Sequence, residues 1–171
     1  MINLRNWTLF LALPLFLSLG GCPQDGGCFD QYDPNDTCIQ ACDIGIIGMD
    51  EAERSWTATI CSAGEEDWFK FTAEEGAEAC IPASSQSFVL QIGLVPPAAD
   101  CPDLQLALYN ESCELLESSE QTGCQEEEIS FFWDGQCGFD DSNVFIVRVY
   151  GADDTQVSQQ EYTLSIDIME M

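Results

Sequence analysis

The alternation of apolar and polar residues becomes regular near residue 55. Beyond that point, short runs rich in aromatic and β-branched residues are separated by turn residues such as Gly, Asn and Asp. Successive side chains of a strand point to opposite faces, so a period of two predicts half-buried strands. The pattern predicts about nine short strands, over residues 55–60, 67–72, 77–81, 88–95, 103–109, 115–118, 129–133, 144–150 and 162–168.

The same alternation predicts which side chains face the interior. In three of the runs the apolar residues share one face, which we expect to be buried. No strong helical period follows residue 50, and strands spaced by about 8–12 residues are typical of sandwiches and barrels. We therefore expect an all-β fold, an antiparallel β-sandwich. The residues that share a face in these runs are Phe69 and Phe71, then Leu104, Leu106 and Leu108, and then Phe145, Val147 and Val149.

The first 21 residues have the features of an export signal. Arg5 is followed by an uncharged stretch over residues 7–19, which is shorter than the about 20 apolar residues of a membrane span and fits a secretory signal. Residues 19–22 (Leu-Gly-Gly-Cys) resemble the lipobox of bacterial lipoproteins. In that family the new N-terminal cysteine, here Cys22, carries lipid. The alternative is an ordinary cleaved signal with Cys22 in a disulfide.

The lipobox resemblance implies a bacterial cell-envelope location. Pro23 follows the cysteine, in place of the Asp that retains some lipoproteins in the inner membrane, so we expect the outer membrane. The polar residues that come next read as a tether. We divide the chain into a signal peptide (1–21), an acidic tether with a short helix over 37–44 capped by Asn35 or Asp36 (22–44), and the sandwich (45–171).

Acidic residues dominate the composition. Asp and Glu number 31 against four Lys and Arg, which gives a formal net charge of −27, or −28 once Arg5 leaves with the signal. Such a chain repels phosphate backbones and anionic head groups, so we expect no nucleic-acid partner. It suits cations and basic partners. We expect contact with the membrane only through lipid on Cys22, together with a protein or polysaccharide partner.

Ten cysteines predict a disulfide framework. Behind an export signal they are typical of an oxidising compartment. A zinc site at Cys38 and Cys42 is the alternative, but zinc sites need repeated Cys pairs or His, and the chain has no His. With Cys22 lipidated, nine cysteines remain. The odd one would be a free thiol or a bridge to a partner.

Strand direction predicts two of the bridges. Cys101 precedes the strand over 103–109 and Cys113 follows it, so they lie roughly 20 Å apart at about 3.3 Å per residue. A disulfide needs Cα atoms within about 7 Å. Cys124 and Cys137 are separated in the same way by the strand over 129–133. Alternating strand directions therefore predict Cys101–Cys124 and Cys113–Cys137.

Five segments resemble the bacterial pre-peptidase C-terminal domain. They are residues 33–37 (Asp-Pro-Asn-Asp-Thr), 65–71 (Glu-Glu-Asp-Trp-Phe-Lys-Phe), 103–109 (Asp-Leu-Gln-Leu-Ala-Leu-Tyr), 144–151 and 162–166. The resemblance implies a jelly-roll sandwich that is not catalytic. In that family the domain accompanies secreted proteases and aids secretion or binds polymers, and some members bind calcium. Two departures are Glu65, where many members have Asp, and Gln105, which interrupts Asp-Leu-Asp.

Candidate chemistry centres on calcium. Asp33, Asn35 and Asp36 offer the oxygen ligands that hard cations prefer, in a segment that carries the family resemblance. The alternative is that these residues serve turns and caps. Nucleophilic catalysis lacks a His, and no catalytic motif is present, so we expect no enzyme. Further acidic loops contain Asp140, Asp141, Ser142 and Asn143, and Asp153 and Asp154.

Strand aromatics allow two interpretations. They could form a binding platform, or alternate rings could fill the sandwich core, which the strand pattern favours. One or two rings over 131–133 should then be exposed. The rings are Trp68, Phe69, Phe71, Phe131, Phe132 and Trp133.

The sequence thus predicts a lipid-anchored envelope protein whose sandwich binds a protein or polymer, with calcium as a candidate cofactor. The alternative is an accessory subunit disulfide-linked to a partner.

Overall fold

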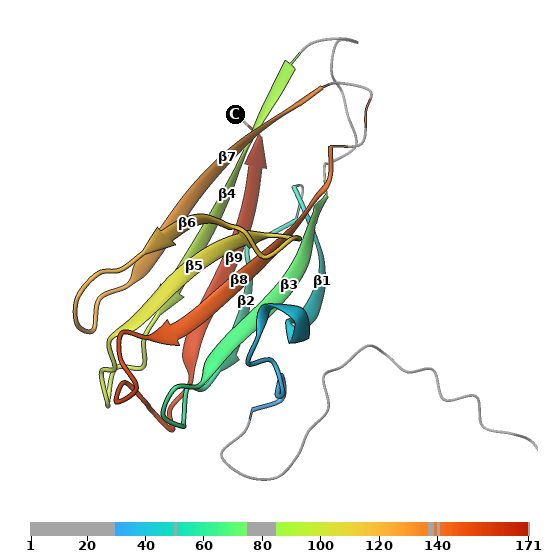
Figure 1. Ribbon diagram of the computed structural model, residues 1–171. Coiled ribbons are helices and arrows are strands. Elements are labelled where there is room, and N and C mark those ends of the chain that lie inside the picture. The colour runs from blue at the N-terminus through green and yellow to red at the C-terminus, as the bar shows by residue number, and fades with distance from the viewer. Residues whose placement is uncertain (1–29, 50, 75–84, 137–138, 140, 171) are drawn as a thin grey trace, which may run out of the picture.

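Two β-sheets packed face to face make up the described part of the chain (Figure 1). The computed structural model describes residues 30–49, 51–74, 85–136, 139 and 141–170. Sheet A has the order β1-β3-β8-β5-β6 and sheet B the order β2-β9-β4-β7. Sheet A contains β1 (Cys42–Gly48), β3 (Glu66–Glu74), β5 (Leu104–Asn110), β6 (Leu115–Ser119) and β8 (Asn143–Gly151); sheet B contains β2 (Arg54–Ala58), β4 (Ser85–Val95), β7 (Glu127–Gln136) and β9 (Tyr162–Glu170).

The strand order confirms the predicted sandwich of jelly-roll type. From β2 to β9 the chain crosses repeatedly from one sheet to the other, so that each sheet contains four of these eight strands. Every pairing among the eight is antiparallel. Strand β1 is added at the edge of sheet A and runs parallel to β3. Among the described residues, no helix is long and apolar enough to cross a membrane.

The core lies between the sheets and uses the faces that the alternation predicts. Phe69 and Phe71 of β3 are fully buried, and the predicted residues of β5 and β8 are buried beside them. Sheet B supplies the opposing layer from β4 and β9. Its fully buried members include Leu90, Ile92, Leu94, Tyr162, Leu164 and Ile166.

The aromatic run of β7 is divided between core and solvent. Phe131 and Trp133 pack against the core, and their rings contact Phe145 of β8 at 5.7 and 5.6 Å between centroids. Phe132 points outward and is 56% exposed. Core filling, the favoured interpretation, is therefore confirmed for two of the three rings.

The segment over 37–44 is not the predicted helix. A 3-10 helix, η1, covers only Cys38–Gln40, with Thr37 at its N-cap position instead of Asn35 or Asp36. Strand β1 follows at once, because pairing with β3 and burial of Cys42 and Ile47 outweigh a local helical preference. The sandwich therefore begins before residue 45. The signal peptide, Cys22 and the strand predicted over 77–81 lie outside the described residues.

One predicted disulfide is confirmed and the other is wrong. Cys101 bonds Cys124, with Cα atoms 5.0 Å apart. Cys113 bonds Cys38, at 6.1 Å, and not Cys137, which lies outside the described residues. The prediction failed because the segment assigned to a tether reaches the β5–β6 turn. Cys42 is also disulfide-bonded, so the zinc alternative for Cys38 and Cys42 is wrong.

Candidate metal centre

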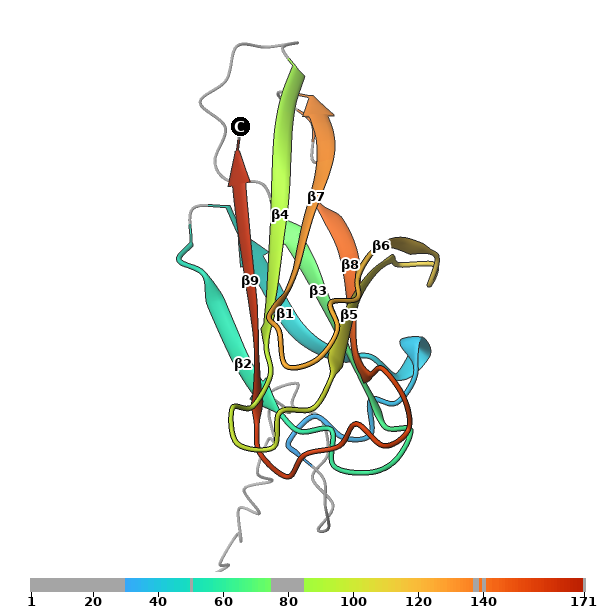
Figure 2. The same ribbon diagram turned by 90° about the vertical axis from the view of Figure 1, so that its left-hand side faces the viewer.

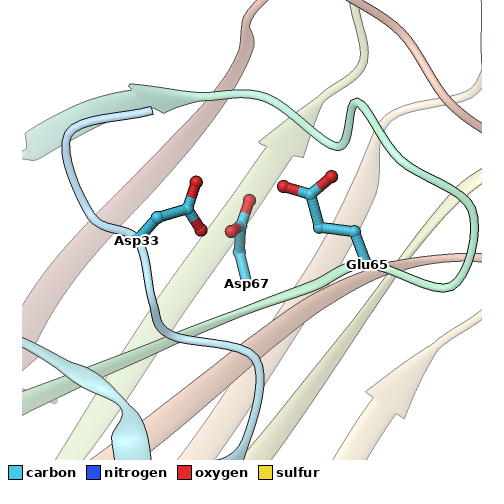
Figure 3. A group of neighbouring side chains, drawn as sticks. All are labelled: Asp33, Glu65 and Asp67. Carbon is cyan, nitrogen blue, oxygen red and sulfur yellow. The ribbon is translucent and has the colours of Figure 1, made fainter. Parts of the chain in front are cut away.

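Three buried carboxylates meet at the end of the sandwich where β3 begins. Asp33, Glu65 and Asp67 each contribute an oxygen, and these oxygens all lie within 4.8 Å of one another. The side chains point toward a common centre, with Asp67 between the other two (Figure 3). The exposed fractions are 6% for Asp33, 9% for Glu65 and 0% for Asp67.

Three separate stretches of chain supply these residues. Asp67 is the second residue of β3, on the same face as Phe69 and Phe71, so the strand itself turns it into the interior. Glu65 ends the β2–β3 loop one residue before β3. Asp33 belongs to the N-terminal segment, which is fixed nearby by the ring of Tyr32 packing edge-on against Phe69 at 5.2 Å.

Two of the carboxylates have one oxygen engaged in a hydrogen bond. Asp33 Oδ2 accepts from the backbone N–H of Asp30 at 3.0 Å. Asp67 Oδ2 accepts from the hydroxyl of Tyr162 at 2.6 Å, from the opposite sheet. These bonds fix the orientation of each carboxylate, so that Oδ1 of Asp33 and Oδ1 of Asp67 face the common centre.

Glu65 is held more tightly still. Its Oε2 accepts three hydrogen bonds, from Cys61 N at 2.8 Å, Ser62 N at 2.6 Å and Ser62 Oγ at 2.9 Å. The β2–β3 loop is therefore wrapped around this carboxylate, which fixes its place beside the other two. Such orientation of ligands by surrounding hydrogen bonds is typical of metal sites.

Asn35 completes the cluster with an amide. It is fully buried. Its hydrogen bonds are satisfied when Nδ2 faces the carboxylates: Nδ2 then donates to Oδ1 of Asp33 and of Asp67, each at 3.2 Å, and Oδ1 accepts from the backbone N–H of Trp68 at 3.3 Å. A cation at the centre would instead favour the amide with its oxygen inward.

Burial disfavours the negative charges of this cluster, which a positive charge at its centre would neutralise. Burial raises the pKa of Asp33 to about 6, assisted by the charges of Asp30 and Glu65. Burial also raises the pKa of Asp67 well above its usual range, although the Tyr162 hydrogen bond opposes the shift. The ion pairs formed within the described ranges use other carboxylates. A proton or a metal cation is left to neutralise the centre.

The sequence prediction identified half of this cluster. Asp33 and Asn35, two of the three predicted residues, lie in it, whereas Asp36 is exposed and is not part of it. Glu65 and Asp67, the other two members, were not predicted. The available signal was Asp67 itself, a charged residue on the core face of a strand whose neighbouring positions are Phe69 and Phe71.

The other acidic loops show local roles. Asp153 accepts hydrogen bonds from the N–H and hydroxyl of Thr155 at 2.8 and 2.5 Å, as turn residues do. These hydrogen bonds lower the pKa of Asp153. In the loop before β8, Asn143 donates to the backbone carbonyl of Asp141 at 2.8 Å. Asp140 lies outside the described residues.

Comparisons with known proteins give distant structural likenesses only. The sequence matches no protein-family model and no curated protein. PliG of Aeromonas hydrophila, a periplasmic inhibitor of g-type lysozyme, is 12% identical with a TM-score of 0.35, over 74% of this chain and 99% of PliG. The VP2 subviral particle of infectious bursal disease virus is 9% identical with a TM-score of 0.27, over 69% of this chain and 32% of VP2. Both likenesses are weak and carry no information on function.

Proposed function

We propose that this protein is a lipid-anchored, non-catalytic protein of the bacterial cell envelope. Its jelly-roll sandwich, which resembles a pre-peptidase C-terminal domain, binds a protein or polymer partner, and the cluster of Asp33, Asn35, Glu65 and Asp67 binds calcium. Disulfides support an oxidising, exported location. The lipid anchor rests on residues 19–22.

The convergence of three buried carboxylates is the observation that carries the calcium proposal. Oxygens of Asp33, Glu65 and Asp67 all lie within 4.8 Å of one another, and these side chains are at most 9% exposed. A cation among them would neutralise charges that burial otherwise disfavours. The Asn35 amide can turn to add its oxygen as a fourth ligand.

The donor atoms favour a hard cation. All four side chains offer oxygen, and calcium takes six to eight oxygen ligands, whereas zinc and copper prefer nitrogen or sulfur. One oxygen each from Asp33, Asn35, Glu65 and Asp67 leaves positions for water or backbone carbonyls. Calcium would then join the N-terminal segment to the β2–β3 loop and to β3. We propose that it fastens the anchored end of the chain to the sandwich.

A binding role without catalysis is supported by the depth of the cluster. Asp33 and Asp67 are buried, and general acids or bases must come within hydrogen-bond reach of their substrate. A polymer could not reach these two carboxylates in the folded sandwich.

The outer face of sheet B indicates the charge of the partner. An open groove of about 460 Å³ crosses β4 at Gly93 and is bordered by several carboxylates. The groove has space at this point because Gly93 has no side chain and its strand partner Ser165 has a small one. Such a groove favours basic groups over anionic polymers. The carboxylates are those of Glu53, Glu126, Glu128 and Asp167.

The second candidate function, an accessory subunit disulfide-linked to a partner, receives less support. Every cysteine among the described residues is disulfide-bonded within the chain. An intermolecular bridge would therefore have to use some other cysteine.

Thermal unfolding tests the calcium proposal directly. Calcium at 1 mM should raise the melting temperature beyond the rise given by sodium chloride at matched ionic strength, because a ligand that binds only the folded state stabilises it. Asp33→Asn should abolish the calcium-specific rise. Asp36→Asn removes an exposed acid of the same segment and should preserve it. Equal effects of calcium and sodium on the wild-type protein would disprove the calcium site.

A further inference from the structure

The loop between the cluster and β1 begins and ends at neighbouring residues of β3. The backbone N–H of Trp68 donates to the carbonyl of Asn35 at 3.0 Å. Cys42, the first residue of β1, pairs with Phe69. The loop over residues 36–41 therefore starts beside Trp68 of β3 and ends beside the next residue of that strand, Phe69. Two such close anchors restrict the ends of this loop but not its tip.

A disulfide holds the tip. Cys38, the first residue of η1, is bonded to Cys113 in the β5–β6 turn, 75 residues away in sequence. Figure 2 shows η1 on the side of sheet A that faces away from sheet B. Ile39, the next residue, is 93% exposed, and Cys113 is exposed as well. This disulfide lies at the surface, where a thiol can reach it.

We propose that the Cys38–Cys113 disulfide and the bound cation stabilise each other, so that reduction of this disulfide weakens cation binding. The inference rests on the calcium site proposed above. Asn35, one of the four ligand residues, lies only three residues before Cys38. The disulfide therefore restricts the chain immediately after the ligands.

The coupling follows from conformational entropy. Cation binding requires Asp33 and Asn35 to be held against Glu65 and Asp67. With the disulfide intact, the loop is already ordered when the cation arrives. With the disulfide reduced, residues 36–41 are tied down only at their ends, and binding must also order them. Calcium affinity should fall for that reason.

The redox step is an ordinary thiol–disulfide exchange. A thiolate of a dithiol reductant attacks one sulfur of the Cys38–Cys113 bond, releases the other cysteine and forms a mixed disulfide. The second thiol of the reductant then attacks this mixed disulfide and releases the remaining cysteine. The S–S bond takes up two electrons and two protons and becomes two thiols. The dithiol is oxidised to a disulfide. Because coupling is reciprocal, bound calcium should protect this bond from reduction.

The equilibrium of disulfide reduction in the wild-type mature protein gives the first test. The protein is equilibrated with mixtures of reduced and oxidised dithiothreitol in 1 mM calcium or in EDTA, alkylated, and mapped by mass spectrometry. At a given mixture, calcium should raise the ratio of oxidised to reduced Cys38–Cys113 at least about fivefold, the lower end of typical coupling. Cys101–Cys124, which is also exposed and is attached to none of the four ligands, is the internal control. Equal protection of both bonds, or of neither, would overturn the linkage.

Calorimetric titration with calcium gives the second test. The double variant Cys38→Ser, Cys113→Ser should bind calcium at least about fivefold more weakly than wild type. The matched variant Cys101→Ser, Cys124→Ser should keep wild-type affinity. Unchanged affinity in the first variant would overturn the linkage and leave the calcium site intact. Absence of calcium binding to the wild-type protein would overturn both proposals. If the first variant does not fold, the reduction equilibrium decides.

Discussion

The hydroxyl of Tyr162 in β9 donates a hydrogen bond to Asp67 in β3 at 2.6 Å, across the interior of the sandwich. Both residues are buried, and burial together with the Asp67 charge raises the pKa of Tyr162 well above its usual range. The phenol is therefore protonated and able to donate at neutral pH. This bond connects sheet B to the candidate metal centre in sheet A.

Removal of that hydroxyl should destabilise the protein. Tyr162→Phe leaves a buried carboxylate oxygen without its donor, and an unsatisfied buried group costs about 1–3 kcal/mol. Urea unfolding in EDTA measures the loss. Tyr32→Phe is the control, because among the described residues the Tyr32 hydroxyl accepts a hydrogen bond only from the exposed side chain of Gln31. Its effect should stay within about 0.5 kcal/mol. Equal losses from the two variants would show that the Tyr162–Asp67 bond contributes nothing specific.

The cluster should give the calcium-free protein an unusual pH dependence. The folded pKa values of Asp33, about 6, and Asp67 are raised, so near pH 6 the folded state binds more protons than the unfolded state. Stability therefore rises as pH falls from 7 toward 4, and this gain is complete below the unfolded pKa. Urea unfolding in EDTA at several pH values measures it. Asp33→Asn should flatten the rise and Asp36→Asn should not; identical profiles would contradict the raised pKa of Asp33.

Arg148 should contribute to stability through its shape as well as its charge. Its guanidinium lies 3.9 Å from the ring centroid of Tyr150 and 5.4 Å from that of Trp68, and it forms an ion pair with Glu66. Cation–π contacts contribute about 0.5–2 kcal/mol each, and a lysine cannot reproduce the planar stacking. Stability should decrease from wild type to Arg148→Lys to Arg148→Ala, as measured by urea unfolding. A lysine variant as stable as wild type would reduce the contribution to charge alone.

The proposed lipid anchor predicts a change of cell fraction. Cys22→Ser removes the proposed acceptor of the lipid, so the protein should move from the membrane fraction to the soluble fraction on ultracentrifugation. Cys28→Ser, which changes a nearby cysteine outside the lipobox-like run, should leave the protein in the membrane fraction. Unchanged fractionation of the first variant would show that Cys22 is not the anchor.

The strands were predictable because their alternation is local. Leu104, Leu106 and Leu108 face the core as expected, since one buried face requires a period of two. Strand β1 was missed because its sequence, Cys-Asp-Ile-Gly-Ile-Ile-Gly, does not alternate cleanly. Gly45 has φ of 96°, and the register with β3 shifts between Asp43 and Gly45. A bulge of this kind moves apolar residues out of phase.

The candidate metal centre was only half predictable because it is assembled by the fold. Asp33 and Asn35 are neighbours in sequence and could be grouped by composition. Glu65 and Asp67 join them only because the N-terminal segment packs under β3, which no local pattern shows. The Cys38–Cys113 bond escaped prediction for the same reason, since the strand-direction argument considered only cysteines that flank strands.

The bulge in β1 also bears on self-association. In the described part of the chain β1 is an edge strand of sheet A, and its Ile46 is 52% exposed. A regular, apolar edge would invite strand addition from a second molecule. Here the backbone N–H of Gly45 donates to the side chain of Asp43 at 3.0 Å, and the strand is kinked at the same place. A neighbouring molecule would meet an irregular, negatively charged edge, which disfavours the joining of two copies into one continuous sheet.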